Sequence, residues 1–303
     1  MRRIPDVAGF DALTVGASVR PGDTIAAPPS WQRFTTARSV AYWRTSPSRG
    51  SVRTPMVLLH GLGADHDGLS DIVAGLGDRD IVVPDLPGYG VSPPLAGPHT
   101  MMAYTAVVED LRTHLGVSSI VLVGHSLGAN ISLAYAATHP ERVAALGLLH
   151  PVCTGVGPVA RLGRAYYRVA TWLPERLARW WVLSRPAIFL ADSMAMTTRE
   201  RSRRRAILAQ DYRAAMLASP RAIGEAYQSL VNTPFLDLAA RVVAPTLLVT
   251  GDRDGFARPA SVRDLAARVP TSRLVVIAGA GHLWPVEDPS AAASLLRSLP
   301  QSA

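Results

Sequence analysis

The 303-residue sequence contains no lysine and only one cysteine, Cys153. A single cysteine cannot form an intramolecular disulfide, so other interactions must hold the fold together. No stretch approaches the roughly 18 consecutive apolar residues of a membrane-spanning helix, which excludes an integral membrane segment. Arg2 and Arg3 are not followed by an apolar stretch. We therefore expect no signal peptide and a cytoplasmic protein.

Because lysine is absent, the net charge of +8 comes from arginine, and it is unevenly distributed. Residues 152–235 carry 13 arginines and five acidic residues, whereas the rest of the chain carries 18 of each. No nucleic-acid-binding motif accompanies this basic segment, so no nucleic-acid partner is expected. Solvent-exposed helix faces are the preferred explanation of this positive charge. Binding of an anionic substrate or of a membrane surface by these arginines is the alternative.

Short apolar runs alternate with helical segments from residue 56 onward. Core strands are expected at residues 56–59, 81–83, 120–123, 145–149, 246–250 and 274–277. Helices are expected at about 69–75, 104–115, 127–138, 260–269 and 289–299. Residues 31–36 and 39–44 predict an antiparallel hairpin at a sheet edge. The alternation predicts an α/β fold with a mostly parallel central sheet and helices on both faces.

One segment interrupts this alternation, and it is expected to be mostly helical. Its helices are predicted at residues 159–173, 175–183, 199–216 and 220–231, with breaks at Pro174, Pro186 and Pro220. We predict a helical cap at 152–235, inserted into a core of 31–151 and 236–303, after an irregular arm at 1–30. The apolar side chains of the insert are interpreted as cap core, part of which roofs a pocket: Trp172, Trp180, Trp181, Phe189, Leu190, Met194 and Met196.

The sequence Gly124-His125-Ser126-Leu127-Gly128 lies where the strand at 120–123 meets the helix at 127–138. A strand that turns directly into a helix must bend sharply, which strains the backbone of Ser126 and lifts its hydroxyl clear of the sheet. Gly124 and Gly128 allow the strand and the helix to approach each other. The amide of Leu127, at the helix N-terminus, points where an oxyanion would lie.

A serine nucleophile needs a base, and the base needs an acid that orients it. Of eight histidines, only His282 follows the last strand, in a loop of small residues that can lean toward Ser126. Asp252 and Asp254 both follow the strand at 246–250. Asp254 lies further round the turn and is the preferred acid, whereas Asp252 is expected to brace the loop. The strand at 145–149 ends in His150 and offers no carboxylate.

The loop after the first core strand is expected to supply a second oxyanion donor. It reads Leu59-His60-Gly61-Leu62-Gly63, and the amide of Leu62 is the candidate. His60 is expected to brace this loop. An amide of this kind contributes about 3 kcal/mol to lowering the barrier.

Five motifs together resemble the α/β-hydrolase fold superfamily. They are His60-Gly61-Leu62-Gly63, the segment Asp85-Leu86-Pro87-Gly88-Tyr89-Gly90-Val91-Ser92, Gly124-His125-Ser126-Leu127-Gly128, Gly251-Asp252-Arg253-Asp254 and Gly281-His282. Their order of nucleophile, acid and base is the one that this superfamily implies, and the helical insert occupies its lid position. The resemblance implies an esterase, lipase or thioesterase.

We therefore expect a serine hydrolase of a carboxylic ester or thioester, with catalytic residues Ser126, Asp254 and His282. Its substrate would be a small molecule with an apolar acyl part, and no metal or organic cofactor is needed. Ser126 argues against the epoxide hydrolases and dehalogenases of this fold, which carry aspartate there. Two alternatives stay open. One is a C–C bond hydrolase of a vinylogous diketone acid, whose carboxylate the basic cap could receive. The other is a non-hydrolytic ligand-binding or cyclase scaffold.

Overall fold

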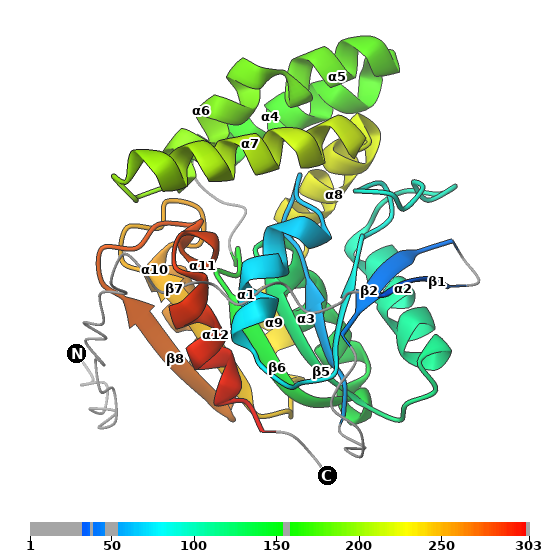
Figure 1. The fold of residues 1–303 in the computed structure, drawn as a ribbon, viewed down its shortest axis with the longest axis vertical. Coiled ribbons are helices and arrows are strands. Elements are labelled where there is room, and N and C mark those ends of the chain that lie inside the picture. The colour runs from blue at the N-terminus through cyan, green and yellow to red at the C-terminus, as the bar shows by residue number, and fades with distance from the viewer. Residues whose placement is uncertain (1–31, 37–38, 46–53, 154–157, 301–303) are drawn as a thin grey trace, which may run out of the picture.

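A single eight-stranded sheet organises the chain (Figure 1). The computed structural model describes residues 32–36, 39–45, 54–153 and 158–300, so the predicted arm at 1–30 lies outside the described residues. The strands are β1 (Gln32–Thr35), β2 (Ala41–Arg44), β3 (Met56–Leu59), β4 (Ile81–Pro84), β5 (Ile120–His125), β6 (Val143–Leu149), β7 (Thr246–Gly251) and β8 (Ser272–Ile277). They are ordered β1-β2-β4-β3-β5-β6-β7-β8.

The pairing confirms the predicted mostly parallel sheet. β1 and β2 pair antiparallel, and β2 also runs antiparallel to β4, whereas β4, β3, β5, β6, β7 and β8 are parallel to one another. Leu59, the last residue of β3, lies opposite Gly124 of β5. His125 lies opposite Leu149, the last residue of β6. The carboxyl ends of these strands therefore meet at one edge of the sheet, where ligands bind in folds of this kind.

Helices cover both faces of the sheet. On one face lie α1 (Ser70–Gly75), α11 (Trp284–Glu287) and α12 (Pro289–Arg297), and on the other lie α2 (Met101–His114), α3 (Leu127–Thr138), α9 (Phe235–Ala239) and α10 (Pro259–Ala266) (Figure 1). Two short 3-10 helices, η1 (His66–Leu69) and η2 (Pro140–Arg142), complete the core. Successive strand residues point to opposite faces, so Val57 packs in the α3 layer and Leu58 in the α12 layer.

The helix boundaries follow local capping chemistry. α2 begins at Met101, three residues before the predicted start, because the Thr100 hydroxyl accepts a hydrogen bond from the amide of Ala103. α12 begins after Asp288, whose carboxylate accepts from the amide of Ala291. A side-chain cap satisfies an amide that has no partner within its own helix, and it thereby fixes where the helix starts.

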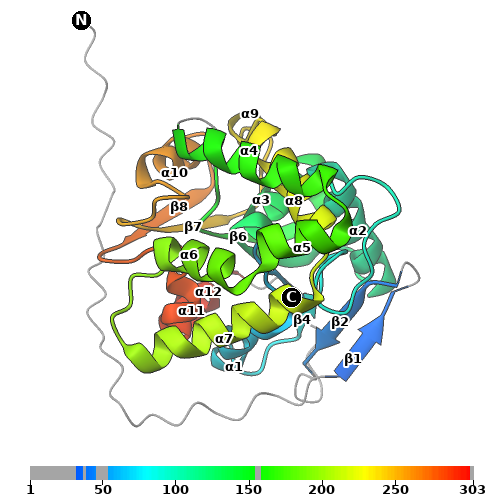
Figure 2. The same ribbon diagram turned by 90° about the horizontal axis from the view of Figure 1, so that it is seen from above.

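Five helices lie above the carboxyl edge of the sheet (Figures 1 and 2). They are α4 (Pro158–Trp172), α5 (Glu175–Leu183), α6 (Arg185–Ala195), α7 (Arg201–Leu217) and α8 (Pro220–Asn232). We call this group the cap helices.

The sequence analysis missed α6 because it interpreted Pro186 only as a break. Pro186 lies in the first turn of α6, where the amide that proline lacks has no helical partner to lose. The assignment of the cap aromatic residues to a core was also wrong for Trp172, Trp180 and Phe189, which are exposed. Helical periodicity shows that a helix has an apolar stripe, but it does not show that the stripe has a partner.

The close approach of α3 to β3 depends on Gly128 and gives a stability prediction. A Cβ on Gly128 would lie 2.2 Å from the carbonyl oxygen of Leu59, so β3 and α3 must separate to admit it. We expect Gly128→Ala to lower the free energy of unfolding by about 2–3 kcal/mol, measured by urea denaturation. Gly97→Ala is the control, because a Cβ there has nothing within 4 Å. Equal stability of the two variants would contradict this account of the packing.

Candidate active site

Ser126 lies at a strained turn between β5 and α3. Its backbone has φ 53° and ψ −116°, in the region that non-glycine residues avoid. The turn is fixed from both sides, since the amide of Ser126 donates to the carbonyl of Leu149 at 2.9 Å and its carbonyl accepts from Asn130 at 3.1 Å. A Cβ on Gly124 would lie 2.1 Å from the carbonyl carbon of Gly128. The two glycines thus permit the tight turn that carries the serine hydroxyl.

A chain of hydrogen bonds joins Ser126 to two other residues at the sheet edge. The Ser126 Oγ donates to His282 Nε2 at 2.8 Å. The proton on His282 Nδ1 is donated to Asp254 Oδ2, also at 2.8 Å. This carboxylate fixes the tautomer, because Nδ1 must carry the proton that Asp254 accepts, which leaves Nε2 as the acceptor. The structure therefore brings Ser126, Asp254 and His282 together from loops that follow β5, β7 and β8.

His150 joins the same carboxylate, and the sequence analysis did not foresee this. Its Nδ1 donates to Asp254 Oδ2 at 2.7 Å, and its side chain is fully buried. Its Nε2 has no hydrogen-bond partner among the described residues. The end of β6 offers no acid, but it carries a polar residue at the carboxyl end of a core strand, and that is the signal in the sequence that points to His150.

The electrostatics keep the Asp254 carboxylate charged and the His150 ring neutral. Burial alone would raise the pKa of Asp254, but hydrogen bonds from His150 and His282 outweigh it and hold that pKa far below its usual value. Amides of Phe256 and Ala257 donate to the other carboxylate oxygen, both at 2.8 Å. Burial lowers the pKa of His150, so its ring stays neutral with one proton on Nδ1. Asp254 is thus an anion that receives four hydrogen bonds.

Three further side chains hold the surrounding loops. His125 Nε2 donates to the carbonyl of His282 at 3.0 Å, and burial followed by the nearness of His282 and His150 lowers the pKa of His125 to about 3. Asp252 accepts from the amide of Gly279 at 2.7 Å and so braces the loop before His282. His60 accepts from the amide of Leu86 at 3.0 Å through Nε2, and its Nδ1 donates to the Gly61 carbonyl at 2.9 Å. The loop positions that contain Ser126, Leu62 and His282 are thereby fixed.

The two candidate oxyanion donors lie on either side of Ser126. A Cβ on Gly61 would lie 3.5 Å from the Cβ of Ser126, so the loop that carries Leu62 packs against the turn. Leu127 is the first residue of α3, so its amide lies at the positive end of the helix dipole. Across the described ranges, neither the Leu62 amide nor the Leu127 amide donates a hydrogen bond to protein. Both amides can therefore serve an oxygen of a ligand.

A cavity of about 600 Å³ lies between the sheet edge and the cap helices. Ser126, His282 and Leu62 line its floor, and mostly apolar side chains of α4 to α8 line its roof. The polar groups of the roof include Asp192 and Asp211, whose negative charges would repel each other. Burial raises the pKa of Asp192 to about 6 and that of Asp211 well above its usual value. Two carboxyls that resist ionisation therefore face an apolar chamber.

The arginines of the cap helices point elsewhere. Among the described residues that line the cavity, the one arginine is Arg258, which precedes α10 in the core. The positive charge of residues 152–235 therefore does not lie on the described chamber wall. Arg258 is the arginine that a substrate anion in the chamber would contact.

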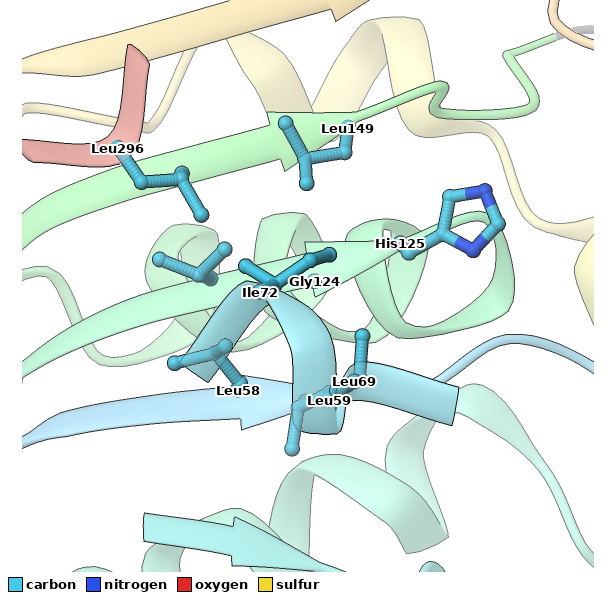
Figure 3. A pocket seen from close by; sticks show the side chains of 9 residues that line it. Leu58, Leu59, Leu69, Ile72, Gly124, His125, Leu149 and Leu296 are labelled. Carbon is cyan, nitrogen blue, oxygen red and sulfur yellow. The ribbon is translucent and has the colours of Figure 1, made fainter. Parts of the chain in front are cut away.

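A much smaller hollow of about 10 Å³ lies inside the core beside the turn (Figure 3). Leucine side chains, among them Leu58, Leu149 and Leu296, surround it near Gly124, while the ring of His125 projects from the end of β5. A space of this size holds at most about one water molecule. It is a packing gap and not a binding site.

His150, Asp254 and His282 also form the group of potential metal ligands in the described part of the chain, with ligand atoms within 4.8 Å of one another. Both ring Nδ1 atoms already donate protons to the carboxylate. A nitrogen that binds a metal cannot carry a proton. Because both Nδ1 atoms carry one, the three side chains are arranged as a hydrogen-bond network.

Comparison with known proteins agrees with the fold. The family model described as alpha/beta hydrolase fold matches residues 54–289. The chain belongs to this family, and it is a hydrolase of that fold. No helix within the described residues is both long and apolar enough to cross a membrane.

Three similar proteins illustrate the range of the relatives. The chain is 30% identical to the magnesium-chelatase 30 kDa subunit of Rhodobacter capsulatus over 281 residues, covering 86% of this chain and 93% of that protein. It is 24% identical to Lipase 1 of Psychrobacter immobilis over 246 residues, covering 77% of this chain and 72% of the lipase. A thermophilic esterase from Thermogutta terrifontis superposes with a TM-score of 0.70 at 28% identity, covering 88% of this chain and 96% of the esterase.

Proposed function

We propose that this protein is a serine hydrolase that cleaves a carboxylic ester or thioester with an apolar acyl group. The observation that carries the proposal is the chain of two 2.8 Å hydrogen bonds from Ser126 through His282 to Asp254, at the floor of a cavity of about 600 Å³. A hydroxyl that donates to a neutral imidazole, itself held by a carboxylate, is arranged for nucleophilic attack.

In the proposed mechanism, Ser126 Oγ attacks the substrate carbonyl while its proton passes to His282 Nε2. The carbonyl oxygen becomes an anion and accepts hydrogen bonds from the amides of Leu62 and Leu127. His282 then returns the proton to the leaving alcohol or thiol as the acyl-enzyme forms. A water molecule then attacks the acyl carbonyl and gives a proton to His282, which passes it to Ser126 Oγ as the acid is released. Asp254 stays ionised throughout and stabilises the imidazolium.

The composition of the chamber favours an uncharged, apolar acyl group. Its roof is mostly apolar, and its carboxyl pair, Asp192 and Asp211, would repel a substrate carboxylate whenever either residue is ionised. This argues against the C–C bond hydrolase alternative, in which cap arginines would receive the acid group of the substrate. It favours neutral esters that are long enough to reach the roof.

The first test removes the nucleophile. We expect Ser126→Ala to lower kcat for p-nitrophenyl esters by about 10⁴-fold or more, and to abolish labelling by a fluorophosphonate probe. Ser132→Ala is the matched control, because Ser132 lies further along the same helix and is bonded only to the carbonyl of Gly128. Undiminished labelling of Ser126→Ala would refute the proposal. A series of esters from short to long chains, with an acyl thioester alongside, would then define the acyl group.

The second test concerns His150, which we infer to be a positioning residue that shares the carboxylate with the base. In His150→Phe, Asp254 Oδ2 would keep His282 as its single imidazole partner. The negative charge of Asp254 would then stabilise the protonated, inactive form of His282 more strongly. We expect the acid limb of the kcat/KM profile to move toward higher pH. The pKa of Asp254 would rise at the same time, because one of the hydrogen bonds that lower it is gone.

His150→Asn is the control for this experiment. Asparagine tolerates the φ of 53° at this position and can place an N–H near the site of the lost Nδ1. We expect its pH profile to match the wild type. An unmoved acid limb in a folded His150→Phe variant would show that the second imidazole is only structural.

A second candidate function rests on the relative that matches over nearly its whole length. The magnesium-chelatase 30 kDa subunit is 30% identical across 93% of its sequence. By analogy, this chain would act as a component of a magnesium-chelating enzyme, whether or not it hydrolyses an ester.

The two candidates separate in one experiment. If the chain is such a component, a magnesium chelatase should chelate magnesium faster when this chain is added. The same acceleration by Ser126→Ala would mean that the role is independent of the serine, whereas its loss would tie the role to hydrolysis. An unchanged chelation rate with the wild-type chain would remove this candidate.

A further inference from the structure

The outer side of the cap exposes large aromatic side chains. Trp172, Trp180 and Phe189 have 71%, 69% and 55% of their surface exposed. They belong to α4, α5 and α6, three consecutive helices that lie above the carboxyl edge of the sheet, at the top of the molecule in Figure 1 and in front of the sheet in Figure 2. Tryptophan is seldom left so exposed in a soluble protein without a binding role, because each ring gives up a large apolar contact.

The apolar surface of the cavity continues to this outer side. Leu162, Leu190 and Met194 line the cavity, yet they have 73%, 63% and 58% of their surface exposed. They lie on α4 and α6, as do Trp172 and Phe189. An apolar molecule could therefore pass between the outer surface and the chamber without crossing a polar rim at these residues.

Exposed arginines share these three helices with the exposed apolar side chains. Arg161, Arg168, Arg176 and Arg185 are exposed on the same three helices. In the described ranges, none of these four lies within 4.0 Å of a carboxylate, and the nearby Glu175 pairs with Arg179 instead. The guanidinium of Arg168 lies 4.8 Å from the ring centre of Trp172. Positive charge and aromatic rings are thus presented together, and they are not neutralised by the protein.

We propose that the outer face of α4, α5 and α6 docks on an anionic lipid bilayer. Tryptophan and phenylalanine rings occupy the boundary between headgroups and acyl chains, and guanidinium groups pair with lipid phosphates. The chamber then opens toward the lipid at Leu162, Leu190 and Met194, so that an apolar substrate enters from the bilayer. The docking does not depend on the chemistry proposed for Ser126.

Charge complementarity selects the bilayer over a second copy of the chain. A symmetric dimer would place the same patch on both subunits, so these arginines would face one another across the contact. Residues 152–235 hold 13 arginines and only five acids, which leaves little negative charge to compensate. An anionic membrane supplies the opposite sign over the whole patch.

The test is sedimentation of the full chain with phosphatidylcholine vesicles that do or do not contain phosphatidylglycerol. We expect binding to the anionic vesicles at least tenfold tighter than to phosphatidylcholine alone, and weaker at high salt. The double variant Trp172→Ser/Trp180→Ser should bind at least tenfold less tightly. Arg161→Glu/Arg176→Glu should lose about fivefold or more for each arginine replaced.

Matched controls lie at the opposite end of the sheet. Val243 is 63% exposed and Arg241 is exposed, both just before β7. Val243→Ser and Arg241→Glu should bind anionic vesicles like the wild type, and so should Ser126→Ala. Failure of the wild type to bind, or equal binding by the cap variants, would overturn the proposal. A dimer in sedimentation velocity that Trp172→Ser/Trp180→Ser abolishes would assign the face to a second copy and would also overturn it.

Discussion

One buried carboxylate holds the functional edge of this molecule together. Asp254 receives two side-chain and two backbone hydrogen bonds, from His150, His282, Phe256 and Ala257. These donors come from the ends of β6 and β8 and from the loop after β7 itself. A carboxylate out of water is costly unless its lone pairs are filled, so the anion fixes where three separate loops can lie. The position of the His282 ring follows from this constraint.

At this edge of the sheet, the residues that stabilise the fold also position Ser126. The strained backbone of Ser126 persists because glycines at 124 and 128 let α3 lie almost against β3 and β5. Larger residues there would push the helix away from the sheet and move the serine with it. His125 then links this turn to the loop after β8, since its ring donates to the carbonyl of His282. Ser126 and His282 are therefore positioned by one network of short-range contacts.

The sequence allowed the parallel sheet and the grouping of Ser126, Asp254 and His282 to be predicted, because parallel strands bring their carboxyl ends to a common edge. The part played by His150 could not be read in this way. Its partner is 104 residues distant, and histidine at a strand end is compatible with simple burial. α6 was missed because proline both ends helices and begins them. The exposed tryptophans were misassigned because an amphipathic pattern does not specify whether its apolar side meets protein or solvent.

The cap resembles an ordinary surface helix layer in where its charge lies, and it departs from one in its exposed aromatic rings. Among the described residues, no cap arginine lines the chamber, whose wall holds leucines, tyrosines and a carboxyl pair that burial keeps from ionising readily, whereas Trp172, Trp180 and Phe189 are exposed. Had the arginines been there to bind a substrate anion, they would have lined the chamber, where the low dielectric strengthens an ion pair. Their outward placement, beside rings that water does not favour, is better matched to an extended surface that is both anionic and apolar. If both proposals hold, the inner wall of the cap would select the substrate, and its outer wall would direct the protein to the lipid surface where that substrate is found.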